Sequence, residues 1–115
     1  MNNLQSECKK ECIKVTKNKL IFLLNEENYT ASLIGNENAY GNIWIPRSIK
    51  YKTKEYIITS IDEYSFKKTF NIKSVEFANN SELQIIKKKA FKKSSLERIS
   101  IPAHVTIICQ GAFSN

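Results

Sequence analysis

Apolar residues recur along the chain in a pattern that ends three times on the same kind of segment. The segments TSIDEYSF, QIIKKKAF and TIICQGAF each place an isoleucine five residues before a phenylalanine. Their alignment arranges the apolar residues in columns: Phe66, Phe91 and Phe113; Ile61, Ile86 and Ile108; Ile58, Leu83 and Val105; Tyr40, Ile72 and Leu96; Ile43, Val75 and Ile99; and Ile45, Phe77 and Ile101. The period is 25 residues from Phe66 to Phe91 and 22 residues from Phe91 to Phe113. Units this short are single coils that bury their apolar sides only by stacking on one another.

Each coil is predicted to contain a short strand. The stretches NIWIP, SVEFA and RISIP alternate apolar and polar positions, as a strand with one face against a core does. The first coil carries an extra stretch, KYKTKEYI, whose alternation about a polar turn predicts a small hairpin. The segments IDEYSF and IIKKKAF are expected to form the opposite wall of the coil, and turns through KKTFN and KKSS return the chain to the next strand.

The first 40 residues lack the repeat and predict a cap. Apolar stretches at 13–15, 20–24 and 29–34 are separated by the polar segments TKNK and NEEN, which indicates two or three strands joined by turns. A β-meander of this kind would close the exposed end of the core, as repeat arrays require. We therefore expect a single domain, with a cap at residues 1–40 and repeats at residues 41–115. A floppy tail is expected only for residues 1 to about 12.

Composition sets the broad class. The chain has 115 residues and is 42% apolar, which is typical of one globular domain. No apolar run approaches the roughly 20 residues that cross a bilayer, and the polar N-terminus shows no export signal. These observations predict an intracellular location.

The cysteines give little support for a metal site or for disulfides. Cys8, Cys12 and Cys109 make an odd number, which argues for reduced thiols. Together with the single histidine, His104, they would make four zinc ligands. Cys109, however, occupies a repeat position that is held elsewhere by charged residues, so we expect it to be partly solvated and predict no metal site.

The chain also shows no catalytic signature. Asp62 and Glu63 are neighbours on an extended segment and would point to opposite sides, so they do not make a paired acid and base. The sequence contains three glycines and no glycine-rich phosphate loop, nucleophile elbow or kinase motif. We therefore predict a protein without a catalytic site or a cofactor, and not an enzyme.

Lysines account for most of the net charge of +7. Lys67, Lys68, Lys92 and Lys93 occupy equivalent turn positions in successive coils, so stacking would align them in what we call the lysine ridge. The ridge suggests polyanion binding, but arginines are few and no base-reading module is present, which disfavours nucleic acid. A solvated edge is the simpler interpretation. The ridge would equally suit an acidic protein tail such as those on cytoskeletal polymers.

Trp44 is predicted to point out of its strand. It lies between the inward-facing Ile43 and Ile45, in a column with Glu76 and Ser100. An exposed tryptophan is a hot-spot candidate at protein interfaces, and the alternative is that the N-terminal cap covers it. The candidate partner-binding residues are Trp44, Glu76, Arg98 and Ser100, together with the lysine ridge.

The last coil is expected to expose apolar side chains. After Phe113 the pattern calls for a turn and a further strand. Without them Ile99, Ile101, Val105, Ile108 and Phe113 would lie at a bare solenoid end. We expect this end to pack against another chain or a second copy, or the sequence to be a shortened relative of a longer protein.

The stretch FKKSSLERISIPAHVTIICQGAF at residues 91–113 resembles the BspA-like class of leucine-rich repeats, and similarity extends over roughly residues 29–115. Two departures from the family pattern occur. Thr69 and Ser94 replace a frequent cysteine, and a frequent glycine is replaced by Asp62, Lys87 and Cys109.

The resemblance implies a mainly β, curved solenoid of about three coils, with parallel strands on one face, short turns on the other and an N-terminal β cap. It further implies a protein-binding scaffold or a component of a structural assembly. For this role the expected location is cytoplasmic or cytoskeletal. The alternative is an adhesion module at the cell surface, because such repeats occur in adhesins of bacteria and parasitic protists that bind host proteins.

Overall fold

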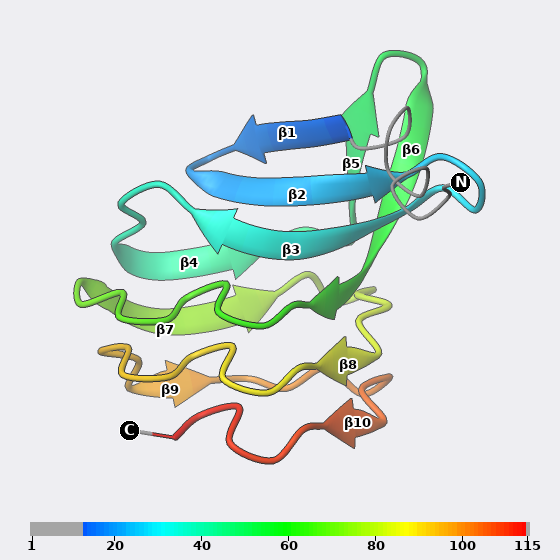
Figure 1. Ribbon diagram of the computed structural model, residues 1–115. Coiled ribbons are helices and arrows are strands. Elements are labelled where there is room, and N and C mark those ends of the chain that lie inside the picture. Colours follow the sequence, from blue (N-terminus) through cyan, green and yellow to red (C-terminus); the bar gives the residue numbers. More distant parts are fainter. Residues whose placement is uncertain (1–12, 115) are drawn as a thin grey trace, which may run out of the picture.

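The computed structural model describes residues 13–114, which form a stack of strands and turns (Figure 1). The strands in chain order are β1 (Ile13–Lys17), β2 (Leu20–Asn25), β3 (Thr30–Asn36), β4 (Gly41–Ile45), β5 (Ser48–Tyr51), β6 (Lys54–Ile61), β7 (Ile72–Phe77), β8 (Ile85–Ile86), β9 (Arg98–Ile99) and β10 (Ile107–Ile108). The expected mainly β repeat architecture is confirmed.

Strands β1, β2 and β3 form the antiparallel meander that the polar turns predict. The β1–β2 turn has positive φ at both central residues, Asn18 and Lys19, which is the backbone of a tight hairpin turn. Strand β3 then pairs in parallel with β6 of the first coil. The meander thus continues one sheet of the solenoid past its first coil, while the domain boundary at residue 40 stays a prediction.

The coils contribute strands to two walls. Strands β4, β7 and β9 form one parallel sheet, and β6, β8 and β10 continue the other sheet in parallel. The predicted strands in NIWIP, SVEFA and RISIP are therefore confirmed. The predicted hairpin is confirmed as β5 paired antiparallel with β6, with Lys52 at positive φ in its turn.

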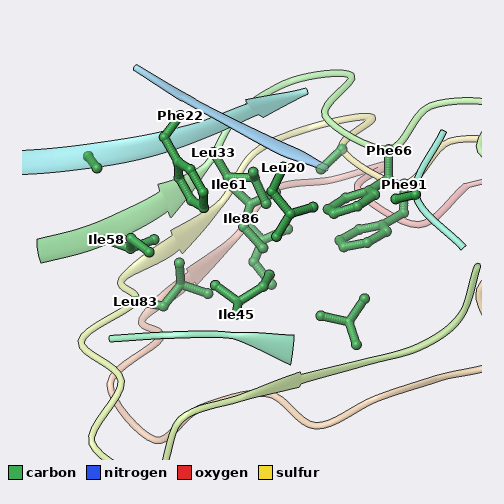
Figure 2. Packing of buried hydrophobic residues seen from close by; sticks show 14 of the residues in the cluster. Leu20, Phe22, Leu33, Ile45, Ile58, Ile61, Phe66, Leu83, Ile86 and Phe91 are labelled. Atoms are coloured by element: carbon green, nitrogen blue, oxygen red, sulfur yellow. The ribbon is translucent and has the colours of Figure 1, made fainter. Parts of the chain in front are cut away.

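The core lies between the two walls and follows the predicted columns. Phe66 and Phe91 are fully buried and stack with ring centroids 4.9 Å apart, as Figure 2 shows beside the buried isoleucines. The members of the other columns that are buried in the first and second coils include Ile45, Ile58, Ile61, Val75, Leu83 and Ile86. Burial of a large apolar side chain contributes about 1.5 to 3 kcal/mol, so these columns supply much of the stability.

The placement of Tyr40 in the column of Ile72 and Leu96 is wrong. Tyr40 is 66% exposed, and Gly41 lies opposite Ile72 in the register of β4 and β7. Gly41 has φ +74°, a conformation that glycine adopts without strain, and the register shifts immediately after it. The chain therefore turns Tyr40 outward, and the preceding residue, Ala39, is buried instead.

The last coil is less buried than the two before it. Among its column residues, Ile101 is 40% exposed, Ile108 48% and Phe113 37%, and the neighbouring Ile107 is 51% exposed. The Phe113 ring still stacks on Phe91, with centroids 5.1 Å apart. These side chains lie open because, in residues 13–114, nothing stacks beyond β9 and β10.

A residue with left-handed backbone conformation recurs in the turns around the column phenylalanines. Tyr64, Lys89 and Gly111 each lie two residues before a column phenylalanine, and all three have positive φ. Lys68 and Lys93, two residues after Phe66 and Phe91, also have positive φ. Only the last coil places glycine at such a position, so the other coils hold larger residues there at a cost of roughly 1 kcal/mol each.

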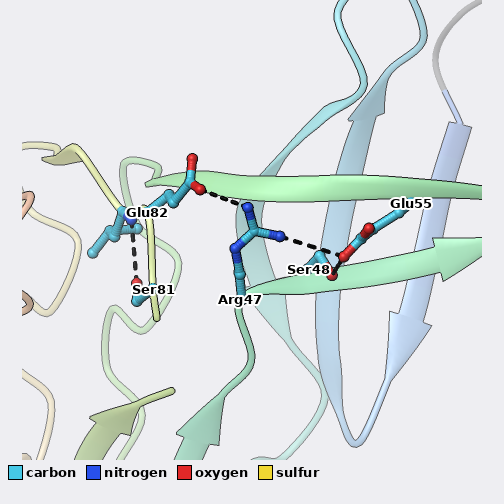
Figure 3. A network of polar contacts seen from close by, with 6 residues as sticks. Arg47, Ser48, Glu55, Ser81 and Glu82 are labelled. Carbon is cyan, nitrogen blue, oxygen red and sulfur yellow. Dashed lines mark hydrogen bonds and ion pairs between the residues drawn. The ribbon is translucent and has the colours of Figure 1, made fainter. Parts of the chain in front are cut away.

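Two polar side chains, Asn36 and Arg47, tie the cap and the hairpin to the coils. The Asn36 amide donates to the carbonyl oxygen of Ser65 at 2.9 Å and to Thr69 Oγ1 at 3.2 Å. In Figure 3, Arg47 bridges two carboxylates, with Nη2 2.6 Å from Glu82 Oε2 and Nη1 3.5 Å from Glu55 Oε2. The hairpin and the turn of the second coil are thereby linked through one guanidinium group.

Candidate protein-binding surface

The outer face of the β4–β7–β9 sheet carries the predicted column around Trp44. Trp44 lies directly opposite Glu76 in the register of β4 and β7, and residues 20–34 leave it 57% exposed. The Ser100 amide donates to the Val75 carbonyl at 3.2 Å, which places Ser100 beside Glu76 on the next rung. Arg98 lies opposite Ser74, displaced from Ser100 along the same segment. The structure thus brings the four residues onto one face.

The lysine ridge also forms as a continuous feature. The Lys68 amide donates to the Lys92 carbonyl at 2.8 Å, so the equivalent turns of two coils lie in direct contact. Lys67, Lys68 and Lys93 are exposed and Lys92 is half-buried. The ammonium group of Lys67 lies 4.7 Å from the Tyr64 ring centroid, within the range of a cation–π contact. The ridge lies on the turns after Phe66 and Phe91, separate from the strand that carries Trp44.

Sequence reasoning missed two exposed aromatic side chains near these surfaces. Tyr40 is 66% exposed just before β4, and Phe70 is 67% exposed after the lysine pair of the first coil. Phe70 lines a groove of about 300 Å³ with Lys67 and Lys68. Phe70 falls outside every apolar column, and that is the one signal in the sequence that would have indicated its exposure.

The residues considered as catalytic or metal-binding candidates, Asp62 and Cys109, hold equivalent positions in their coils. Asp62 and Lys87 hold equivalent positions in successive coils, and Lys87 Nζ lies 3.6 Å from Asp62 Oδ1. Cys109 follows in the same position and is half-buried. Cys8 and Cys12 lie outside the described residues. Within residues 13–114, no group of three or more histidine, cysteine or acidic side chains has an arrangement that would hold a metal ion.

The buried Tyr56 has a shifted pKa. Burial raises the pKa of the Tyr56 phenol above its usual value, and the carboxylate of Glu26 adds to this effect. Tyr56 packs against the Tyr29 ring, with ring centroids 5.6 Å apart. Because Tyr56 is only 2% exposed, its shift is a property of the core.

Residues 13–114 contain no helix that is long enough and apolar enough to cross a bilayer.

A protein-family model described as a BspA type leucine rich repeat region matches residues 35–115 in 6 copies. No protein with a curated function matches the chain.

Solved structures of bacterial repeat proteins share the fold. A leucine-rich cell surface protein of Faecalibacterium prausnitzii superposes with a TM-score of 0.69 at 23% identity, over 88% of this chain and 27% of that one. A leucine-rich repeat protein of Bacteroides ovatus gives a TM-score of 0.69 at 20% identity, over 87% of this chain and 32% of that one. A leucine-rich repeat protein of Bacteroides capillosus gives 0.54 at 21% identity, over 85% and 99%. The chain therefore spans about a quarter to a third of the length of the first two proteins.

Proposed function

The chain belongs to the BspA-type leucine-rich-repeat family, and from this premise we propose that it is a non-enzymatic protein-binding scaffold. The observation that carries the proposal is Trp44, which is 57% exposed on β4 between the partly buried Ile43 and the buried Ile45. A large, stiff aromatic side chain on a rigid sheet contributes much of the free energy at protein interfaces. Its neighbours Glu76, Arg98 and Ser100 supply a polar rim of the kind that surrounds such an anchor.

The lysine ridge gives this scaffold a preference for acidic partners. Four lysines on two adjoining coils make a field that raises the encounter rate with an acidic protein segment. Polyanion binding is a second candidate function, supported by the contact between the Lys68 and Lys92 turns. Nucleic acid is the weaker form of that candidate because the ridge contains only lysines and no arginine.

A cell-surface location has more support than the expected cytoplasmic or cytoskeletal one. The protein of F. prausnitzii that shares the fold is described as a cell surface protein. No comparison supports the cytoplasmic expectation. We therefore place adhesion, meaning the binding of proteins outside the cell, ahead of an intracellular assembly role.

The exposed apolar side chains of the last coil offer a further packing surface. Ile101, Ile107, Ile108 and Phe113 of the last coil are each at least 37% exposed. Each gains free energy when it is removed from water. We propose that the last coil packs against another protein segment, such as a second copy of the chain.

Crosslinked capture from the native cell tests the scaffold proposal. The wild-type chain is expected to retain a protein partner that Trp44→Ala loses. Tyr29→Ala is the control, because it removes another exposed aromatic side chain, 41% exposed, that belongs neither to the Trp44 surface nor to the lysine ridge. Equal capture by all three chains would show that the Trp44 surface is not the interface.

A further inference from the structure

Strand β4 is an edge strand with a free side. In the order β4–β7–β9, its one neighbour among the described strands is β7. The Gly41 amide donates to Asn71 and the Ile45 carbonyl accepts from Ala78, so the odd-numbered residues of β4 direct their backbone groups toward β7. Backbone groups alternate sides along a strand that pairs in parallel. The N–H and C=O groups of Asn42 and Trp44 therefore face away from the sheet.

A groove runs along this free side of β4. Its first part has a volume of about 400 Å³ and lies between the β1–β2 turn and the segment from Ala39 to Trp44. Its second part, of about 170 Å³, continues past Trp44 to Pro46 and Ile49. Asn18, Leu20 and Trp44 line both parts, so the two parts lie next to each other along β4.

The groove has an apolar floor and aromatic walls. Leu20 and Ala39 are buried beneath it. Tyr40 and Trp44 stand exposed beside the free backbone groups. An extended peptide recognised in this way gains main-chain hydrogen bonds from the edge strand and places alternate side chains on the floor.

The charge of the groove is of one sign. Lys17, Lys19 and Lys50 line it, all three are exposed, and its lining contains no acidic residue. Within residues 13–114, none of these lysines takes part in an ion pair. A peptide that carries carboxylates on the side away from the floor would complement them.

From the free edge, the groove and its charge we infer that β4 binds an acidic, extended protein segment by strand addition. This inference rests on the proposed protein-binding function and specifies the partner's chemistry at the same site. The bound segment adds a fourth strand to the β4–β7–β9 sheet, puts apolar side chains against Leu20 and Ala39, and puts carboxylates beside Lys17, Lys19 and Lys50.

Fluorescence of the full chain tests this inference directly, because Trp44 is its single tryptophan. The probe is a capped peptide of alternating glutamate and valine, about as long as β4. Titration is expected to shift the Trp44 emission to shorter wavelength in a saturable way, because the added strand removes water from the indole. Two further probes are methylated at every second peptide nitrogen, one at the odd-numbered and one at the even-numbered residues. The probe that lacks the N–H donors facing β4 is expected to lose binding, whereas the other probe is expected to keep it.

Charge reversal supplies the matched variants. Lys19→Glu is expected to raise the Kd of the glutamate probe severalfold and to improve binding of a probe with lysine in place of glutamate. Lys88→Glu makes the same change of charge on an exposed residue outside the groove and is expected to leave both affinities unchanged. Equal effects of the two variants would overturn the inference, since attraction would then come from the net charge.

Three other outcomes would contradict strand addition. The first is that the glutamate probe leaves the Trp44 emission unchanged. The second is that both methylated probes bind as well as the parent probe. The third is that the emission shifts with protein concentration alone while the mass doubles, which identifies a second copy as the occupant. The proposed function is tested separately by partner capture. If Trp44→Ala loses the partner, the proposed function stands even when the peptide probes fail. If Trp44→Ala retains the partner, the proposed function is rejected whatever the probes show.

Discussion

Phe66 and Phe91 stack almost parallel, with an interplanar angle of 5° and ring centroids 4.9 Å apart. This distance matches the spacing of roughly 4.7–4.9 Å between hydrogen-bonded strands, so the sheet sets the ring spacing. The backbone follows the same ladder, since the Phe66 amide donates to the Ala90 carbonyl at 2.7 Å and the Phe91 amide to Ala112 at 2.8 Å. Rings and backbone thus stabilise the same register between coils.

Truncation of Phe91 is expected to be more damaging than truncation of Phe113. Phe91 is 2% exposed and has a ring on each side, whereas Phe113 is 37% exposed and contacts one ring. Phe91→Ala should lower the free energy of unfolding by about 3–5 kcal/mol, and Phe113→Ala by roughly half as much or less. Chemical denaturation of both variants measures the difference, and equal losses would contradict the ladder as the source of coil registration.

Replacement of Trp44 should separate affinity from stability. The indole is 57% exposed, so Trp44→Ala should change the free energy of unfolding by no more than about 0.5 kcal/mol. At an interface, the same change should cost about 2 kcal/mol or more of binding free energy. Calorimetry with the captured partner measures both quantities. A large loss of stability with unchanged affinity would show that Trp44 serves packing alone.

Lys93→Gly is expected to be less destabilising than the same substitution at a lysine with negative φ. Lys93 is exposed and has φ 58°, so glycine removes a backbone strain of roughly 1 kcal/mol. Lys88→Gly is the matched control, because Lys88 is an exposed turn lysine that is not among the residues with positive φ. Both variants are destabilised by the greater freedom of the unfolded chain, and only Lys93→Gly offsets this cost by the relief of strain. Thermal unfolding should therefore show the higher midpoint for Lys93→Gly, and equal midpoints would contradict strain at Lys93.

Neutralisation of the lysine ridge should weaken binding in a salt-dependent way. Glutamine at Lys67, Lys68, Lys92 and Lys93 removes four charges, and exposed charges act mainly on the encounter rate and are screened by salt. The association rate with the captured partner should fall most at low ionic strength and little at high ionic strength. Rates that respond neither to salt nor to the substitutions would leave the ridge as a solvated edge.

Exposed isoleucines of the last coil should drive self-association. Ile107 is 51% exposed and Ile108 48%. Lysine at both positions should lower the concentration-dependent mass measured by sedimentation, and Phe70→Lys is the control because Phe70 is 67% exposed elsewhere. A wild-type chain that is monomeric at high concentration, with residues 99–114 protected from hydrogen exchange, would contradict the proposed packing.

The repeat made much of the fold predictable, because each column is sampled by several coils. The buried positions of Phe66 and Phe91 and the outward direction of Trp44 follow from that repetition and from strand alternation. Tyr40 was misplaced because the φ of +74° at Gly41 and the register shift after it are local backbone features. An apolar pattern does not encode features of this kind.

Contacts between segments that are distant in the chain also could not be predicted from the sequence. The amide of Asn36 reaches Thr69 across 33 residues of chain, and no spacing rule connects the two. The groove beside β4 likewise joins Leu20 to Trp44. It depends on where the β1–β2 turn lies relative to the first coil, and this placement is settled by packing.

The unequal lengths of the strand pairings determine the order in which the coils would separate under a pulling force. Strands β4 and β7 pair over five positions, whereas β7–β9, β6–β8 and β8–β10 each pair over two. A pulling force along the stack loads these hydrogen bonds one after another, so the coils joined by the fewest bonds peel away first. The meander, held by the longer pairings of β1, β2 and β3, gives way last. Under tension the molecule would lengthen coil by coil, from the last coil toward the cap.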